Sequence, residues 1–136
     1  MIKLGERGLY LRCAGGPALS GMGRACPQDL SAWAERELWA PCFQVRVVGT
    51  TGAGDATIAG FLAALLRGLG PEEAATLAVA VGACNVEAAD ALSGLRSWEE
   101  TLARVRSGWA RLPLRLKASG WEWDVANGVW QYHPSD

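Results

Sequence analysis

The stretch that decides the fold is residues 43–66, FQVRVVGTTGAGDATIAGFLAALL. Its first part, Phe43 to Val48, alternates apolar and polar residues with the period of a strand and ends abruptly at Gly49. Beyond the glycine-rich turn, apolar residues recur at helical spacing: Ile58, Phe61, Leu62, Leu65 and Leu66. The stretch therefore predicts a strand, a loop and a helix in succession.

The loop between the strand and the helix has the composition of an anion-binding turn. Gly52 and Gly54 allow backbone angles that side chains forbid, and they leave successive N–H groups accessible. The helix that follows adds unpaired amides and the positive end of its dipole, which suit a transferring phosphoryl group. The loop is not a Walker A motif, because no Gly-Lys-Ser/Thr follows. It is not a Rossmann G-x-G-x-x-G either, because Asp55 interrupts the pattern.

Asp55 stands in the first turn of the predicted helix and has two interpretations. A carboxylate beside a phosphate pocket can accept the proton of an attacking hydroxyl group, as a general base does. An aspartate at a helix start can also stabilise the helix by capping and by interaction with the dipole. The spacing alone leaves both interpretations open.

The remaining pattern predicts two hairpins and further helices. Residues 2–4 and 9–13 form a hairpin around a turn, and the glycine- and proline-rich stretch 14–41 encloses one short helix. That helix carries Leu30, Trp33, Ala34 and Leu38. The long helices are expected at 54–68, 71–88 and 98–107, the second opened by Pro71 and the third by a Ser97–Glu100 capping box.

Residues 114–136 form a tryptophan-rich tail within a single domain of 136 residues. A hairpin around a type I′ turn at Asn127-Gly128 is predicted there. Core or interface anchoring is the commoner role of such tryptophans, and a partner chain would contact them first.

Composition excludes several classes of function. The net charge of −1 and the scattered basic residues argue against nucleic acid as a partner. The four cysteines form no C-x-x-C pair and His133 is the only histidine, so no metal site is expected. No apolar run is long enough to cross a bilayer, and we expect a soluble, cytoplasmic protein with no membrane partner.

The glycine loop and the residues after it, Val48 to Phe61, resemble the carboxy-terminal signature of PfkB-family carbohydrate kinases, the group of ribokinase, fructokinases and adenosine kinase. The resemblance implies an α/β chain, the C-terminal half of a ribokinase-like three-layer α/β/α sandwich. It implies ATP-dependent phosphoryl transfer to a hydroxyl of a sugar-like substrate, with ATP and Mg²⁺ required. Asp55 is then the base, and Gly52, Ala53 and Gly54 form the anion hole.

Two more stretches resemble the same family in the same order. The segment from Lys3 through Gly5 to Gly8 is similar to the turn beside the nucleotide phosphates, and Asn85 lies in a helix segment similar to the one bordering adenine. With Thr51, these residues are the implied nucleotide contacts. The plain alternatives are an ordinary hairpin turn and a helix-interior polar residue satisfied locally.

The departures from the family pattern are equally specific. Gly49 stands where many members carry an aspartate that helps hold an activating monovalent cation, which puts potassium dependence in doubt. Lys3 replaces a common threonine. Family enzymes are also markedly longer, with the sugar site in their amino-terminal half. The alternative function is therefore a nucleotide-binding module or inactive kinase fragment that pairs with another chain, either a second copy or the missing half.

Overall fold

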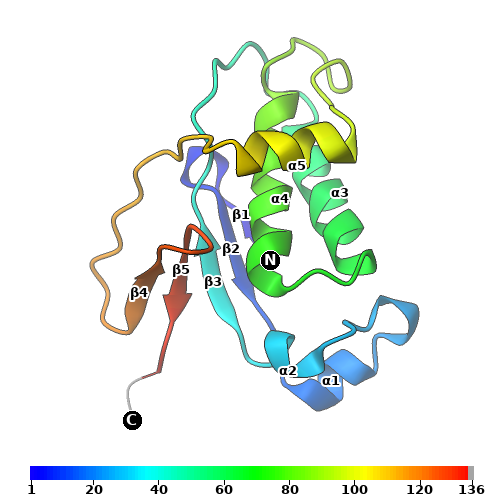
Figure 1. Ribbon diagram of the computed structural model, residues 1–136, viewed down its shortest axis with the longest axis vertical. Helices are drawn as coiled ribbons and strands as arrows, with labels where there is room; N and C mark the ends of the chain where they lie inside the picture. The colour runs from blue at the N-terminus through cyan, green and yellow to red at the C-terminus, as the bar shows by residue number, and fades with distance from the viewer. Residues whose placement is uncertain (135–136) are drawn as a thin grey trace.

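The computed structural model describes residues 1–134 and combines helices with one five-stranded antiparallel sheet (Figure 1). The strands are β1 (Ile2–Lys3), β2 (Leu9–Arg12), β3 (Glu37–Ala40), β4 (Trp121–Asp124) and β5 (Val129–Tyr132). The helices are α1 (Gly16–Ser20), α2 (Leu30–Trp33), α3 (Ala53–Leu66), α4 (Pro71–Asn85) and α5 (Trp98–Arg106). The strand order is β1-β2-β3-β5-β4, so the tail hairpin extends the sheet. The architecture agrees with the α/β class, and the ribokinase-like sandwich stays a prediction.

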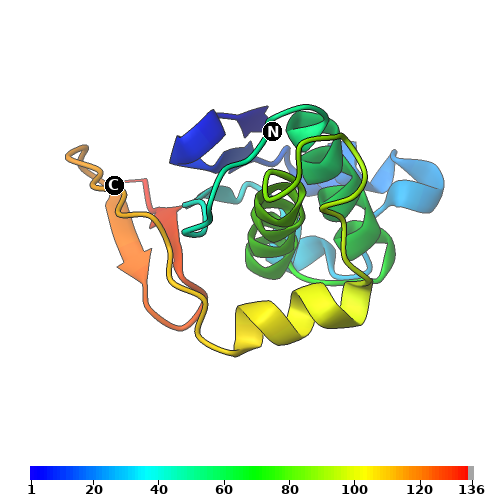
Figure 2. The same cartoon turned by 90° about the horizontal axis from the view of Figure 1, so that it is seen from above.

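The sheet curves around α4, and α3, α4 and α5 lie together on one side of it (Figure 2). The sheet residues in the core are Leu9, Leu11, Leu38, Ala40 and Val129. Leu11 is paired with Leu38 across β2 and β3, so both side chains leave the same face of the sheet. Helix α4 is buried along most of its length, as its nearly continuous apolar sequence predicts.

Two glycines let α3 and α4 approach closely. A Cβ atom at Gly60 would lie 2.9 Å from Cγ2 of Val81, and one at Gly82 would overlap the hydroxyl oxygen of Thr57. The Thr57 hydroxyl donates in turn to the carbonyl oxygen of Ala53 at 2.8 Å. The first turn of α3 is therefore held directly against α4.

The three long helices are confirmed, with small differences at their ends from the predicted ranges 54–68, 71–88 and 98–107. The capping box of α5 is complete. The Glu100 amide donates to Ser97 Oγ at 3.1 Å, and the Ser97 amide donates to the Glu100 carboxylate at 2.9 Å. Local signals were sufficient for these elements because caps and helical periodicity act within one segment.

The strand predicted over 43–48 is wrong. The segment makes one isolated bridge among the described residues, from Phe43 to Arg111, and the Gln44 amide donates to the carbonyl of Ala110 at 2.8 Å. The edge of β3 that is not paired with β2 is taken by β5. Alternating residues specify an extended backbone, but they do not specify which strand it pairs with.

Strand β3 was not predicted from the sequence. It lies within residues 14–41, which were predicted to form a loop enclosing one short helix. Helix α2 ends at Trp33, and Glu35 then adopts a left-handed φ of 57°, which a helix cannot accommodate. Leu38, predicted on that helix, lies in β3 opposite Leu11 and is fully buried. The short helix α1 was also not predicted.

The first hairpin, β1 and β2, is confirmed, and so is the tail hairpin, but the type I′ turn is wrong. Four residues separate the paired residues Asp124 and Val129, and Gly128 alone among them has a positive φ, of 65°. A type I′ turn needs positive φ at both central residues. The Asp124 carboxylate accepts the amides of Ala126 and Asn127, which stabilises a longer loop.

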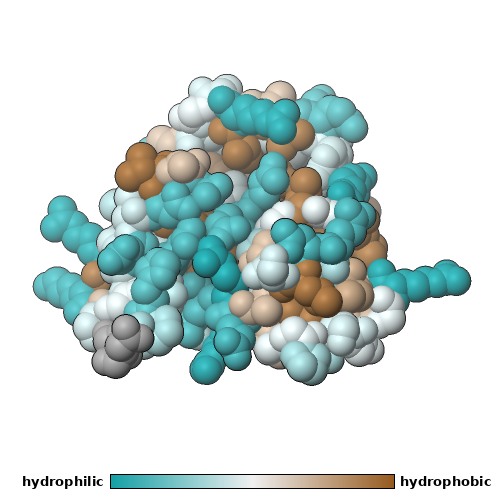
Figure 3. Space-filling model, turned by 60° about the horizontal axis from the view of Figure 1, so that its bottom comes forward, coloured by the Kyte–Doolittle hydropathy of each residue, from teal (hydrophilic) through white to brown (hydrophobic). Residues whose placement is uncertain are grey.

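The surface mixes hydrophilic and hydrophobic side chains. In the view of Figure 3, the hydrophobic areas are separated by hydrophilic ones and do not form one continuous face. Among residues 1–134, no helix has the length and apolar character needed to span a membrane.

Candidate functional site

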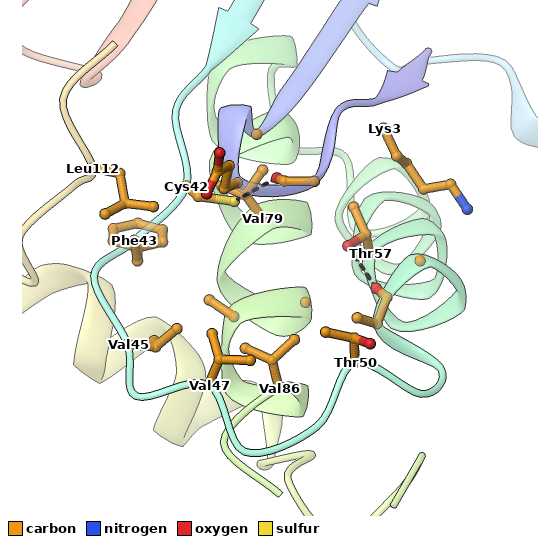
Figure 4. Close-up of a pocket in the computed structure, with 17 residues that line it drawn as sticks. Lys3, Cys42, Phe43, Val45, Val47, Thr50, Thr57, Val79, Val86 and Leu112 are labelled. Atoms are coloured by element: carbon orange, nitrogen blue, oxygen red, sulfur yellow. Dashed lines mark hydrogen bonds between the residues drawn. The ribbon is translucent and has the colours of Figure 1, made fainter. Parts of the chain in front are cut away.

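A cavity of about 400 Å³ lies between the β1–β2 turn, the segment that precedes α3, and the facing sides of α3 and α4. One part of it is polar, with Lys3, Thr50 and Thr57 near the start of α3 (Figure 4). The other part is apolar, and its side chains are Phe43, Val45, Val47, Val86 and Leu112. The cavity thus offers a charged region and an apolar region to one elongated ligand.

The glycine loop leaves amide groups unpaired at the polar end of this cavity. Gly52 adopts a left-handed φ of 75° and precedes the first residue of α3, so the chain turns sharply into the helix. The Ala53 amide donates to the carbonyl of Thr50 at 3.2 Å, whereas the amides of Gly54 and Asp55 have no acceptor within residues 1–134. Unpaired N–H groups at a helix start attract anions.

Lys3 brings a positive charge to the same place. Its side chain extends from β1 to α3, and a Cβ atom at Gly54 would lie 2.7 Å from its Nζ. Glycine at position 54 therefore lets the ammonium group lie against the helix start. Lys3 is exposed and makes no ion pair with any described residue.

Asp55 is the third residue of α3 and is exposed beside this polar end. No hydrogen bond or ion pair reaches its carboxylate from the part of the chain that the structure describes. A capping hydrogen bond is therefore not its role here, although interaction with the helix dipole remains open to it. Its carboxylate is available to a ligand.

The turn between β1 and β2 forms another wall of the cavity. Gly5 and Gly8 both line it, and Gly8, with a φ of 91°, packs so closely on the carbonyl of Ala40 that a side chain would overlap it. The close packing of Gly8 fits the ordinary turn interpretation as well as a ligand-binding one. Cys42 lies beside this turn, where burial raises the pKa of its thiol and so keeps it protonated.

Four of the predicted site residues do not line the cavity: Thr51, Gly52, Asp55 and Asn85. Asn85 is fully buried and its Nδ2 donates to the carbonyl of Ala91 at 2.7 Å, while its Oδ1 has no partner within residues 1–134. A Cβ atom at Gly52 would lie 2.8 Å from Cβ of Ala91. Asn85 thus holds the segment that packs on the glycine loop through its Nδ2, while its Oδ1 is left unpaired, so its predicted contact with the nucleotide stays a prediction.

The structure brings together five of the predicted site residues along the cavity: Lys3, Gly5, Gly8, Ala53 and Gly54. Sequence reasoning missed the apolar wall. The alternation of Phe43, Val45 and Val47 was its signal, because these residues face the cavity although no strand forms. Thr57 and Leu112 carried no comparable signal.

No three histidine, cysteine, aspartate or glutamate side chains among the described residues form a cluster that could hold a metal ion. The cavity is lined by one carboxylate side chain, that of Glu6, and Asp55 stands beside it. These two groups alone do not make a magnesium site, for which phosphate oxygens commonly complete the coordination.

In a comparison with known protein families, residues 32–98 match the model of the pfkB family of carbohydrate kinases. A comparison with curated proteins found no match to the chain. The matched segment covers just under half of the sequence and runs from α2 to the start of α5. It contains the glycine loop, α3 and α4, which form one side of the cavity. Residues 32–98 of this chain are therefore similar to the pfkB family of carbohydrate kinases.

Proposed function

We propose that this protein transfers the γ-phosphoryl group of ATP to a hydroxyl of a sugar or sugar-like substrate. The observation that carries the proposal is the proximity of the Lys3 ammonium group to Gly54, whose amide is unpaired and which lines one end of the cavity. Asp55, the next residue of α3, also has an unpaired amide, and its exposed carboxylate accepts no hydrogen bond from residues 1–134. The family of residues 32–98 supports the same class of reaction.

The cavity suggests how the nucleotide would lie. The base and ribose would occupy the apolar part, where burial of a flat ring against Val45 and Val86 is favourable. The phosphates would then reach the glycine loop, whose amides stabilise the negative charge of the transferring group. In this arrangement the γ-phosphate would lie close to Asp55, the residue that follows Gly54.

Asp55 acts as the general base of the reaction. The substrate oxygen forms a bond to the γ-phosphorus, the bond from that phosphorus to the bridging oxygen of ADP breaks, and the hydroxyl proton passes to the Asp55 carboxylate. Magnesium, which the family generally uses, is not held by a carboxylate cluster of the described residues.

The test compares Asp55→Asn with Glu99→Gln, an exposed carboxylate in the first turn of α5 that also makes no hydrogen bond with a described residue. We expect Asp55→Asn to lower turnover of ATP with a panel of sugars by about 10²- to 10⁴-fold. Both variants should keep the wild-type unfolding free energy within about 0.5 kcal/mol. Wild-type turnover in Asp55→Asn would contradict the assignment.

One observation favours the alternative function, a nucleotide-binding module or inactive fragment that pairs with another chain. The outer edge of β1 has no partner among residues 1–134, and an unpaired edge can accept a further strand. In that case isothermal titration calorimetry detects ATP binding while no sugar is phosphorylated. Light scattering then shows whether a second copy pairs with the first.

A further inference from the structure

The backbone before the glycine loop leaves no room for a side chain at residue 49. A Cβ atom at Gly49 would lie 2.7 Å from the carbonyl oxygen of Ala89 and 2.9 Å from that of Ala88. The amide of Gly49 is itself bound to the carbonyl of Val86 at 3.2 Å, which fixes this approach. These are backbone atoms, so they cannot move aside as the end of a side chain could.

An aspartate at position 49 is therefore excluded on two grounds. Its Cβ would overlap the carbonyl groups of Ala88 and Ala89. The negatively charged carboxylate would also be attached next to two carbonyl oxygens, which carry partial negative charge. The carboxylate that holds an activating monovalent cation in many family members does not fit this structure. Among residues 1–134, the backbone at position 49 therefore leaves no place for that carboxylate ligand.

A different positive charge is available at the helix start. Lys3 is the only lysine or arginine among the described residues that line the cavity, and its Nζ lies against Gly54. Glu6 lines the cavity and Asp55 stands in the first turn of α3, and neither carboxylate makes an ion pair with Lys3. The ammonium group is thus available to a phosphate oxygen.

We infer that Lys3 supplies the positive charge at the phosphoryl-transfer site and that this protein needs no monovalent cation. The inference rests on the proposed function. An ammonium group beside Gly54 would stabilise the charge on the transferring phosphoryl oxygens without a bound ion. The reaction should consequently proceed equally well in potassium, sodium and choline salts of the same ionic strength.

The experiment has a binding arm and a turnover arm, each run in potassium, sodium and choline chloride at equal ionic strength. The binding arm titrates inorganic tripolyphosphate into the full chain by calorimetry. We expect wild-type affinity to agree within about twofold among the three salts, and Lys3→Met to weaken it by about 10- to 100-fold. Lys3→Arg should restore most of the affinity, because it keeps the charge.

Lys117→Met is the matched control, since Lys117 is the other lysine of the chain, is exposed and lies outside the cavity. It should bind tripolyphosphate as the wild type does, and circular dichroism should show that every variant is folded. An affinity at least tenfold higher in potassium than in choline would overturn the inference. So would an unchanged affinity in Lys3→Met.

The turnover arm separates the inference from the proposed function. If sugar phosphorylation is observed, it should be insensitive to the choice of cation and reduced in Lys3→Met. If no alcohol is phosphorylated in any salt, the proposed function is wrong, and the binding arm still decides the role of Lys3. Turnover that requires potassium would overturn the inference and leave the proposed function standing.

Discussion

The contact between Gly82 and Thr57 gives the sharpest test of the packing that positions the glycine loop. A methyl group at Gly82 would overlap Oγ1 of Thr57 and lie 3.4 Å from the carbonyl of Ala53, which is an ordinary contact. Thr57→Ala removes the overlapping oxygen. The effect of Gly82→Ala should therefore change sign between the wild-type and the Thr57→Ala backgrounds.

The magnitude follows from two opposing terms. Overpacking the α3–α4 contact costs about 1–3 kcal/mol, because Thr57 must leave its rotamer and its hydrogen bond to Ala53, or the helices must separate. Alanine in a helix interior is favoured over glycine by about 0.8–1.0 kcal/mol. Gly82→Ala alone should thus destabilise the protein by about 1 kcal/mol. In the Thr57→Ala background it should stabilise the protein by up to about 1 kcal/mol.

Urea denaturation of the four proteins measures both steps, with the midpoint compared at constant m value. The coupling energy between the two substitutions should be about 1–3 kcal/mol, which corresponds to a difference in Tm of several degrees. If Gly82→Ala has the same effect in both backgrounds within about 0.5 kcal/mol, the two side chains do not meet as described. The reasoning about this contact would then be refuted.

Three further outcomes are expected. Asn85→Ala removes the hydrogen bond to the Ala91 carbonyl and should lower the unfolding free energy by about 1–3 kcal/mol, with faster hydrogen exchange in the segment around Ala91. Ser97→Ala removes the α5 cap and should cost about 0.5–2 kcal/mol in urea denaturation, whereas Ser97→Thr should retain most of the stability. The hydrogen bond from Arg104 lowers the pKa of Glu87 below its ordinary value of 4.5. The ionised carboxylate therefore stabilises the fold at pH values above 4.5. The stability difference between wild type and Glu87→Gln should be present at pH 7 and shrink as the pH falls below 4.5 and through the lowered pKa, which a series of urea titrations would show.

Much of the site was predictable because its parts lie close together in the chain. The glycine loop, the start of α3 and Asp55 are neighbours in sequence, and their geometry follows from the glycines and the helix that begins there. The match of residues 32–98 to the pfkB family confirms the resemblance that this loop carries. The roles of Asp55 and Lys3 in catalysis stay predictions.

The contacts between distant segments of the site could not be read from the sequence. Asn85 stays a predicted nucleotide contact, and the return of the chain after α4 brings the Ala91 carbonyl within reach of its Nδ2. Thr51 is next to the cavity in sequence but does not line it. Lys3 was expected near phosphate, yet only the folded structure shows that it crosses to Gly54.

The sequence by itself determined the local elements of this protein: the glycine loop, the three long helices and the two hairpins, all specified by caps, glycines and periodicity within single segments. Tertiary structure alone decided which extended segments pair. Residues 43–48 have the better strand pattern, yet the edge of β3 is occupied by β5 from the tail. Strand pairing depends on contacts between residues far apart in sequence, and no single segment contains both partners.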